Sequence, residues 1–284
     1  AGANRASLHA DGDVGVAVGI HANEFSQLLA QSPAGSSVYA ATNALSVASG
    51  RISYALGMQG PCTSVETACS ASLAAAHSAA RAVRHGECER HLAAGVNLIL
   101  LLASSAGMAV AGMTSPVGRC HTFDRRADGF TRGEGCSSAA ISSPVAPCWL
   151  SLCGSAVRQD GRSASLTAPN GQAQQALLHA ALRDARVHPH EIALCEAHGT
   201  GTPLGDPVEV GSLGGVVLPE RQISMALGSA KAGCAHTEST AGAAGLLRLA
   251  EQLTRAATAP NAQLRALNPH VGGALRGLAC ALPT

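Results

Sequence analysis

The chain has 284 residues, of which 46% are apolar and 13% are charged, and its formal net charge is +1. An average soluble domain carries roughly 25% charged residues. This composition therefore excludes a disordered chain, and the near-zero net charge excludes the basic surface of a nucleic-acid-binding protein. Aromatic residues make up only 2% of the chain, whereas glycine numbers 32, which indicates a core of small, closely packed side chains.

Predicted strands and a helix open the first half of the chain. Residues 14–20 (VGVAVGI) form a continuous apolar run typical of a buried strand, and a second apparent strand covers residues 63–67. Residues 70–84 predict a helix that ends at Gly86. Residues 90–100 predict a further strand. The inward face of the helix is expected to consist of Leu73, Ala76, His77 and Ala80.

An uncharged stretch leaves two interpretations open. Residues 92–113 carry no charge and are long enough to span a bilayer. The stretch also contains Asn97, Ser104 and Ser105, and its most apolar piece is the short run 98–103. A buried strand followed by a segment of small residues fits this pattern as well, and no membrane span is expected.

A domain boundary is predicted near residue 146, within the segment 142–148 (SSPVAPC), which contains two prolines. It divides the chain into an N-terminal half, residues 1–146, and a C-terminal half, residues 147–284. Both halves alternate short apolar runs with alanine-rich stretches, which is the pattern of an α/β fold. Two similar α/β halves are therefore expected.

The second half carries two predicted helices and two short strands. Residues 172–185 predict a helix capped by Asn170, because a side-chain oxygen at that position can accept from the first N–H groups. Residues 192–196 and 224–229 predict short strands, and residues 241–255 predict a second helix.

Ten cysteines and twelve histidines raise the question of disulfides or a metal site. No CxxC pair occurs, and His188 and His190 have no third ligand nearby in the sequence, so no metal site is expected. Residues 1–10 lack the basic and apolar segments of a secretory signal, although the first residue is not Met. These features predict a reducing compartment, the cytoplasm or an organelle with a reducing interior, and cysteines that mostly fill the core.

Cys69 differs from the other cysteines because it lies between the apparent strand 63–67 and the predicted helix 70–84. The N–H groups and the dipole at a helix start favour a thiolate, and the same N–H groups can stabilise an oxyanion. Cys69 is therefore a candidate nucleophile. A cysteine at a helix start is also a common inert core residue, so position alone leaves both interpretations open.

Two histidines stand at comparable positions in the second half. His198 follows the predicted strand 192–196 within EAHGTGTPLGD, and His236 lies between a strand and a helix within GSAKAGCAHTESTAG. Folds of the α/β class place ligands and catalytic groups at the ends of buried strands. One thiol and two histidines in such positions favour nucleophilic catalysis assisted by hydrogen-bond donors. The Gly-Thr run after His198 does not form a dinucleotide fingerprint.

Five segments of the chain together match the motif pattern of one protein family. They are GPCTSVETACSASLAAAHSAA, GRCHTFDRRADGFTRGEGC, GSAVRQDGRSASLTAPNGQAQQALL, EAHGTGTPLGDPVE and KAGCAHTE. In content and order they resemble the motif blocks of the β-ketoacyl synthases, or ketosynthases, of the type I modular polyketide synthase kind. The resemblance runs from about residue 14 to residue 270.

The resemblance implies a thiolase-like fold, in which two similar α/β halves pack in α-β-α-β-α layers. It also implies the reaction, a decarboxylative Claisen condensation of a malonyl-type extender with an acyl group held on Cys69, in polyketide or fatty acid biosynthesis. His198 and His236 match the pair that hydrogen-bonds the malonyl thioester oxygen and stabilises the enolate. Lys231 and Glu238 match a charged pair that supports the site.

The resemblance implies partners as well. Thr200 and Thr202 match the hydroxyls that hold a phosphopantetheine arm, so substrates are expected to arrive as thioesters on an acyl carrier protein. No metal or redox cofactor is implied. A homodimer, or a place within a larger synthase or assembly, is expected.

Two departures from the family pattern stand out. Gly233, Cys234 and Ala235 occupy the positions where relatives carry Asn-Ile-Gly, and the Cβ of Ala235 is expected to shift His236. Family members are also longer, so the fold is expected to be incomplete at both ends. This shortness leaves an alternative function open, that of a catalytically silent, ketosynthase-derived structural subunit of a larger assembly.

Overall fold

The computed structural model describes residues 13–21, 24–32, 43–143 and 148–284. The chain divides into two compact units, each assembled from three segments. The first comprises Ala1–Leu102, Gly133–Trp149 and Thr237–Ala243, and the second comprises Ala103–Arg132, Leu150–His236 and Ala244–Thr284. The predicted boundary at residue 146 and the predicted lack of a secretory signal in residues 1–10 lie outside the described residues, so both stay predictions.

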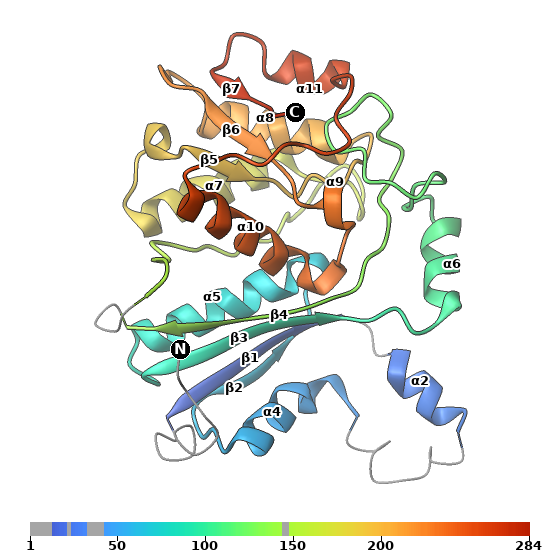
Figure 1. The fold of residues 1–284 in the computed structure, drawn as a ribbon, viewed down its shortest axis with the longest axis vertical. Helices are drawn as coiled ribbons and strands as arrows, with labels where there is room; N and C mark the ends of the chain where they lie inside the picture. Colours follow the sequence, from blue (N-terminus) through green and yellow to red (C-terminus); the bar gives the residue numbers. More distant parts are fainter. Residues whose placement is uncertain (1–12, 22–23, 33–42, 144–147) are drawn as a thin grey trace. The chain divides into compact units, whose positions relative to one another are not determined.

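A four-stranded sheet in the order β2-β1-β3-β4 is the framework of the first unit (Figure 1). Its strands are β1 (Val14–Ile20), β2 (Cys62–Val65), β3 (Arg90–Asn97) and β4 (Gly135–Ser142). β1 lies parallel to β2 and β3, whereas β4 runs antiparallel to β3. The predicted strand 14–20 is confirmed. Its continuous apolar run follows from its central place, because a parallel strand covered on both faces buries successive residues.

Two helices cover the faces of this sheet. α4 (Ala48–Leu56) packs on β1 and β2, and α5 (Ala71–Arg84) packs on β1 and β3. Figure 1 shows them on opposite sides of the sheet. α5 lies close to β1 because Gly19 has no side chain, and a Cβ at Gly19 would lie 2.4 Å from the carbonyl carbon of Ala71. This close approach fixes the start of α5 against the sheet.

The predicted inward face of α5 is confirmed at Ala80, which is 4% exposed, and is wrong at Leu73. Leu73 is 46% exposed. The buried residues of the helix are Ala71, Ser72, Ala75, Ala79, Ala80 and Ala82. The prediction placed the largest apolar side chain in the core, but the short distance between α5 and β1 admits only small side chains. Leu73 is therefore excluded from the sheet side of the helix.

β3 ends at Asn97 rather than at the predicted residue 100. From this point on, side chains form hydrogen bonds with the backbone in place of a neighbouring strand. The amide of Asn97 donates to the carbonyl of Gly133 at 2.8 Å. Glu134 accepts from the N–H of Ile99 at 2.8 Å. Glu24, the buried first residue of α2 (Glu24–Ala30), accepts from the N–H groups of residues 100 and 101 at 2.6 Å each.

A three-stranded parallel sheet in the order β5-β6-β7 is the framework of the second unit. Its strands are β5 (Leu194–Glu196), β6 (Met225–Gly228) and β7 (Cys280–Ala281). β5 and β6 confirm the two predicted strands and are slightly shorter. The side chains of Met225 and Leu227 belong to a buried apolar cluster that includes Val210, Leu213 and Phe123.

The second unit contains α7 (Gly171–Ala185), α8 (Gly205–Val216), α9 (Lys231–Cys234) and α11 (Pro269–Ala274). α8 packs against both α7 and α11. The Asn170 side chain accepts from the backbone N–H groups of Gln172 and Ala173, which confirms the predicted cap. α10 (Ala241–Arg255) has the predicted bounds.

The uncharged stretch 92–113 is divided between β3 and α6 (Leu102–Val110). Among the residues that the structure describes, no helix combines the length and the apolar character needed to cross a membrane.

The expectation that the cysteines mostly fill the core is wrong. All ten lie within the described residues, yet only Cys88 and Cys120 are buried. Five are exposed: Cys62, Cys136, Cys148, Cys153 and Cys234. Two of these lie in the edge strands of the four-stranded sheet, Cys62 in β2 and Cys136 in β4.

Candidate active site

Cys69 lies in a tight turn of the first unit, between β2 and α5. It is the middle residue of the short 3₁₀ helix η3 (Ala68–Ser70), and α5 begins two residues later. Ala68 has a φ of +50°, a conformation that residues with a side chain rarely adopt. The Ser70 hydroxyl donates to the carbonyl of Thr67 at 2.8 Å. The predicted strand-to-helix turn is confirmed, and it places a half-buried thiol at the N-terminal end of a 14-residue helix.

The second unit brings His198 and His236 together. His198 follows the end of β5, and His236 follows α9. Their ring centroids are 5.4 Å apart with the planes nearly perpendicular at 87°. Phe130 packs edge-on against the His236 ring at 5.0 Å, and the backbone N–H of His236 donates to the carbonyl of Thr131 at 2.8 Å. The rings are therefore held by packing and by the backbone.

Both imidazoles are neutral at pH 7. Burial lowers the pKa of His236 to about 2, together with repulsion from the neighbouring His198 ring when it is protonated and from the charge of Lys231. Desolvation, followed by the charge of Lys231, lowers the pKa of His198 to about 3. His198 keeps an exposed edge, but the downward direction of its shift is sufficient to keep its ring neutral. A neutral imidazole carries one N–H donor and one acceptor nitrogen.

Lys231 adds to both shifts, after the larger effect of burial. It is the first residue of α9 and is only 6% exposed. Its positive charge also lowers the pKa values of Asp206 and Glu209, although burial has the larger effect and raises both above their ordinary values. A buried cation beside two histidines makes their protonation unfavourable and leaves them as donors.

Two carboxylates hold the loop that carries His198. Glu209 accepts from the N–H of His198 at 2.6 Å and from the N–H of Gly199 at 2.9 Å. Asp206, which is fully buried, accepts from the N–H of Gly201 at 3.1 Å. Both acids belong to α8, so the helix start fixes the backbone of the loop.

Thr200 and Thr202 share this loop. Their hydroxyl oxygens are 3.3 Å apart, Thr200 is buried, and Thr202 is half-buried. The segment 121–130 supports the loop at two points: the Thr122 hydroxyl donates to the carbonyl of Gly199 at 2.6 Å, and the N–H of Gly129 donates to the carbonyl of Gly201 at 3.0 Å. The structure therefore presents two neighbouring hydroxyls on a rigid backbone.

The predicted site residues are distributed over both units. Glu238 opens the short helix η5 (Glu238–Thr240) of the first unit and is buried. The first unit supplies Cys69 and Glu238, and the second supplies Lys231, His198, His236, Thr200 and Thr202. The second unit brings its two histidines together, as expected. The grouping of Cys69 with these histidines, and the pairing of Glu238 with Lys231, stay predictions.

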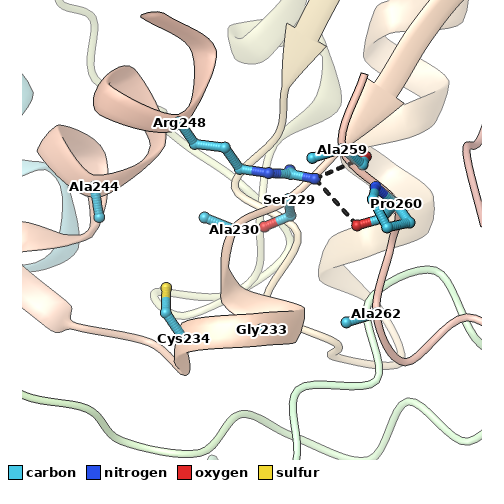
Figure 2. Close-up of a pocket in the computed structure, with 9 residues that line it drawn as sticks. All are labelled: Ser229, Ala230, Gly233, Cys234, Ala244, Arg248, Ala259, Pro260 and Ala262. Carbon is cyan, nitrogen blue, oxygen red and sulfur yellow. Dashed lines mark hydrogen bonds between the residues drawn. The ribbon is translucent and has the colours of Figure 1, made fainter. Parts of the chain in front are cut away.

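A pocket of about 330 Å³ opens beside α9 in the second unit (Figure 2). Arg248 spans it and donates to the carbonyls of Ala259 at 3.0 Å and Pro260 at 3.2 Å. Its guanidinium also forms an ion pair with Glu196 at 2.6 Å. Glu196 accepts from the N–H of Ala230, directly before Lys231. This ion pair fixes the start of the turn that carries the buried lysine.

Comparison with known proteins yields two family matches that together cover most of the chain. The family described as "Beta-ketoacyl synthase, N-terminal domain" matches residues 1–143, and the one described as "Beta-ketoacyl synthase, C-terminal domain" matches residues 150–265. The chain belongs to the β-ketoacyl synthase family.

Curated relatives are polyketide synthases. The mycocerosic acid synthase-like polyketide synthase of Mycolicibacterium smegmatis is 42% identical over 254 residues, which are 87% of this chain and 12% of that protein. Polyketide synthase ThaG of Burkholderia thailandensis is 40% identical over 282 residues, which are 95% of this chain and 5% of that protein. The chain thus spans a small part of these relatives.

Solved ketosynthases confirm the predicted thiolase-like fold. The ketosynthase from module 6 of the bacillaene synthase of Bacillus subtilis 168 matches with a TM-score of 0.89 at 30% identity, over 99% of this chain and 50% of that one. The oxazolomycin ketosynthase domain OzmH KS7 of Streptomyces albus JA3453 matches with a TM-score of 0.92 at 31% identity, over 100% and 50%. The chain spans about half the length of these ketosynthases.

The turn before His236 contains an alanine in an unusual backbone conformation. Ala235 has φ +67° and ψ 178°, a region that essentially only glycine occupies. A glycine would suit this backbone, whereas the alanine strains it. The strained conformation persists because the backbone N–H groups of Ala235 and His236 are bonded to the carbonyls of Lys231 and Thr131.

Sequence reasoning missed several residues that position the site. Glu196, Asp206 and Glu209 lie inside the block EAHGTGTPLGDPVE, but they are acidic groups that bind backbone N–H rather than substrate. Their spacing along the block gives no sign of this role. Thr122 is 77 residues from the carbonyl that it binds, so only the fold reveals the contact.

Proposed function

We propose that this chain is a condensing enzyme that joins an acyl group and a malonyl-type extender, both carried as thioesters, with loss of CO2. The observation that carries the proposal is the pair of neutral imidazoles, His198 and His236, 5.4 Å apart beside a buried lysine. Two neutral N–H donors suit an enolate oxygen, which needs donors aimed at a developing negative charge rather than a strong base.

Cys69 takes the acyl group in the first step. Its thiolate attacks the acyl thioester of the carrier, a new thioester forms on Cys69, and the carrier leaves as its free thiol. The N-terminal N–H groups of α5 favour the thiolate and then the oxyanion of the tetrahedral intermediate. Membership of the β-ketoacyl synthase family supports this role for the thiol.

The extender reacts in the second step. His198 and His236 donate hydrogen bonds to the thioester carbonyl oxygen of the malonyl group. The bond to the carboxylate breaks, CO2 leaves, and its electron pair forms the enolate. The enolate carbon attacks the acyl thioester, the β-ketoacyl product forms on the carrier, and Cys69 is released as a thiolate. Burial and the charge of Lys231 keep both imidazoles neutral throughout, and Glu238 balances the charge of Lys231. No metal or redox cofactor enters this sequence.

The partner is an acyl carrier protein, whose phosphopantetheine arm lies against Thr200 and Thr202. Their neighbouring hydroxyls suit the amide groups of such an arm, because a hydroxyl both donates and accepts. The curated relatives are polyketide synthases many times longer than this chain, which supports a place for it in a large synthase. A homodimer is part of the proposal.

Acylation of Cys69 tests the first step. The folded chain is incubated with an acyl-pantetheine thioester, digested with trypsin and analysed by mass spectrometry. The tryptic peptide 52–81 contains both Cys62 and Cys69, so the variants Cys62→Ser and Cys69→Ser are run in parallel. The acyl mass is expected to persist in Cys62→Ser and to vanish in Cys69→Ser. Equal labelling of both variants, or no acylation of the folded protein, would contradict the proposal.

A further inference from the structure

His121 and Asp128 face each other in the second unit without a hydrogen bond. The Nδ1 atom of His121 lies 4.0 Å from the Oδ1 atom of Asp128. Both atoms are buried, and neither has a hydrogen-bond partner within the part of the chain that the structure describes. His121 as a whole is only 5% exposed. The Asp128 side chain is 36% exposed as a whole, but its Oδ1 atom and the His121 Nδ1 atom are buried, and a buried polar atom without a hydrogen bond is unfavourable.

The position of His121 and Asp128 in the fold indicates a role for the pair. His121 directly precedes Thr122, whose hydroxyl binds the carbonyl of Gly199 at 2.6 Å. Asp128 directly precedes Gly129, whose N–H binds the carbonyl of Gly201 at 3.0 Å. The pair therefore joins the two points at which the segment 121–130 holds the loop 199–202.

The loop also packs directly on His121. Gly201 has φ +79°, and a Cβ there would lie 2.7 Å from the backbone nitrogen of His121. A shift of the His121 backbone must therefore move Gly201, and with it the neighbouring hydroxyls of Thr200 and Thr202.

We infer that His121 and Asp128 are a positioning pair for the loop that receives the pantetheine arm. The two side chains lie 4.0 Å apart, and in this proposal they close to a direct hydrogen bond when the arm binds. Contacts at binding sites are often long without a ligand and shorten in the complex. Closure gives both buried atoms a hydrogen-bond partner, so it favours the arm-bound form of the loop. The inference rests on the proposed function, because it takes Thr200 and Thr202 as the arm site.

Two acyl donors distinguish an effect on the position of the loop 199–202 from a general loss of structure. One is an acyl-pantetheine thioester, and the other is the same acyl group on thiophenol, which has no arm. Asp128→Ala and His121→Leu remove one partner each, whereas Asp128→Asn and His121→Asn retain a polar atom near the same place. The first two variants are expected to raise the KM for the pantetheine donor about tenfold, since small misplacements have large effects. Their rates with the thiophenyl donor, and both rates of the conservative variants, are expected to stay within about twofold of the unmodified chain.

Arg126→Gln is the matched control. Arg126 lies in the same segment and pairs with Asp124 at 2.8 Å, away from the loop 199–202. Its loss is expected to affect both donors equally. If Asp128→Ala also slows both donors equally, or leaves the pantetheine KM unchanged, the positioning role is overturned.

Hydrogen exchange distinguishes failure of this inference from failure of the proposed function. If Cys69 accepts no acyl group from either donor, the proposed function fails, but exchange at the backbone amides of residues 199–202 can still be measured. Adding pantetheine itself is expected to slow this exchange in the unmodified chain and in Asp128→Asn, and not in Asp128→Ala. Equal slowing in all three would overturn the inference.

Discussion

The two segments that carry the histidines are anchored by different means, although burial and the charge of Lys231 lower the pKa of both rings. The loop of His198 is bound by carboxylates at successive N–H groups, and its glycines occupy the positive φ values. The turn of His236 has no such carboxylate at its N–H, which donates to the Thr131 carbonyl, and the preceding Ala235 sits at φ +67°. Both imidazoles are nevertheless neutral.

This difference indicates which segments of the site tolerate substitution. The His198 loop depends on buried acids whose loss leaves unsatisfied N–H groups. The His236 turn depends on packing against Phe130 and on Lys231, and it already contains a residue that its backbone does not favour. Substitutions of the buried acids should therefore destabilise the His198 loop, whereas a substitution in the His236 turn should be able to stabilise it.

The largest effect is expected from removal of either ring. His198→Ala and His236→Ala should each lower the rate of malonyl-pantetheine decarboxylation by about 10²–10³, the loss typical of one oxyanion donor. The matched variants His198→Asn and His236→Asn retain a neutral donor and should keep part of the rate. CO2 release measures the rate. If Asn and Ala variants are equally slow, the rings do more than donate hydrogen bonds.

Next in size is the effect of Glu209→Gln. An amide offers only one acceptor oxygen, so the N–H of His198 or of Gly199 loses its partner, at a cost of about 1–3 kcal/mol in the free energy of unfolding. Urea unfolding measures the change. Glu251→Gln, which alters an exposed pair on α10, is the control and should change little. A Glu209→Gln variant as stable as the control would show that the loop does not depend on this acid.

A smaller effect is expected from pH. The pKa of His236 lies far below its unfolded value of roughly 6.5, so below that pH the unfolded chain binds the extra proton and stability falls. Between pH 7 and 5.5 this group should account for about 1 kcal/mol. The variant His236→Gln lacks the titrating group, so its unfolding free energy should fall less over this range. If the unfolding free energies of the two proteins fell equally between pH 7 and 5.5, the lowered pKa of His236 would be contradicted.

The smallest effect, and the only gain, is expected from Ala235→Gly. Glycine adopts φ +67° without steric strain, and the relief exceeds the added flexibility of the unfolded chain, for a net gain on the order of 1 kcal/mol or less. Thermal unfolding measures it. Ala232→Gly, in the middle of α9, is a matched control in which the same substitution should destabilise. A loss of stability in Ala235→Gly would mean that its backbone is not strained.

The sequence predicted elements whose signal is local. β1, the Asn170 cap and α10 were found because apolar periodicity and a capping side chain act over a few residues. The face of α5 was mispredicted because the depth of its contact with β1 depends on Gly19, about fifty residues earlier in the chain. Among site residues, the turn around Cys69 and the meeting of His198 with His236 followed from strand ends and motifs. His121 and Asp128 did not, because the loop that they support lies about seventy residues further along the chain.

The exposed cysteines have a practical consequence for anyone who labels this protein. Five thiols at the surface will react with iodoacetamide or a maleimide dye, so the number of labels per chain says nothing about the nucleophile. The useful quantity is the order in which peptides acquire the label at low reagent concentration. A half-buried thiol that reacts before Cys62, its exposed neighbour on the same tryptic peptide, would reveal enhanced reactivity at Cys69 even without an acyl donor.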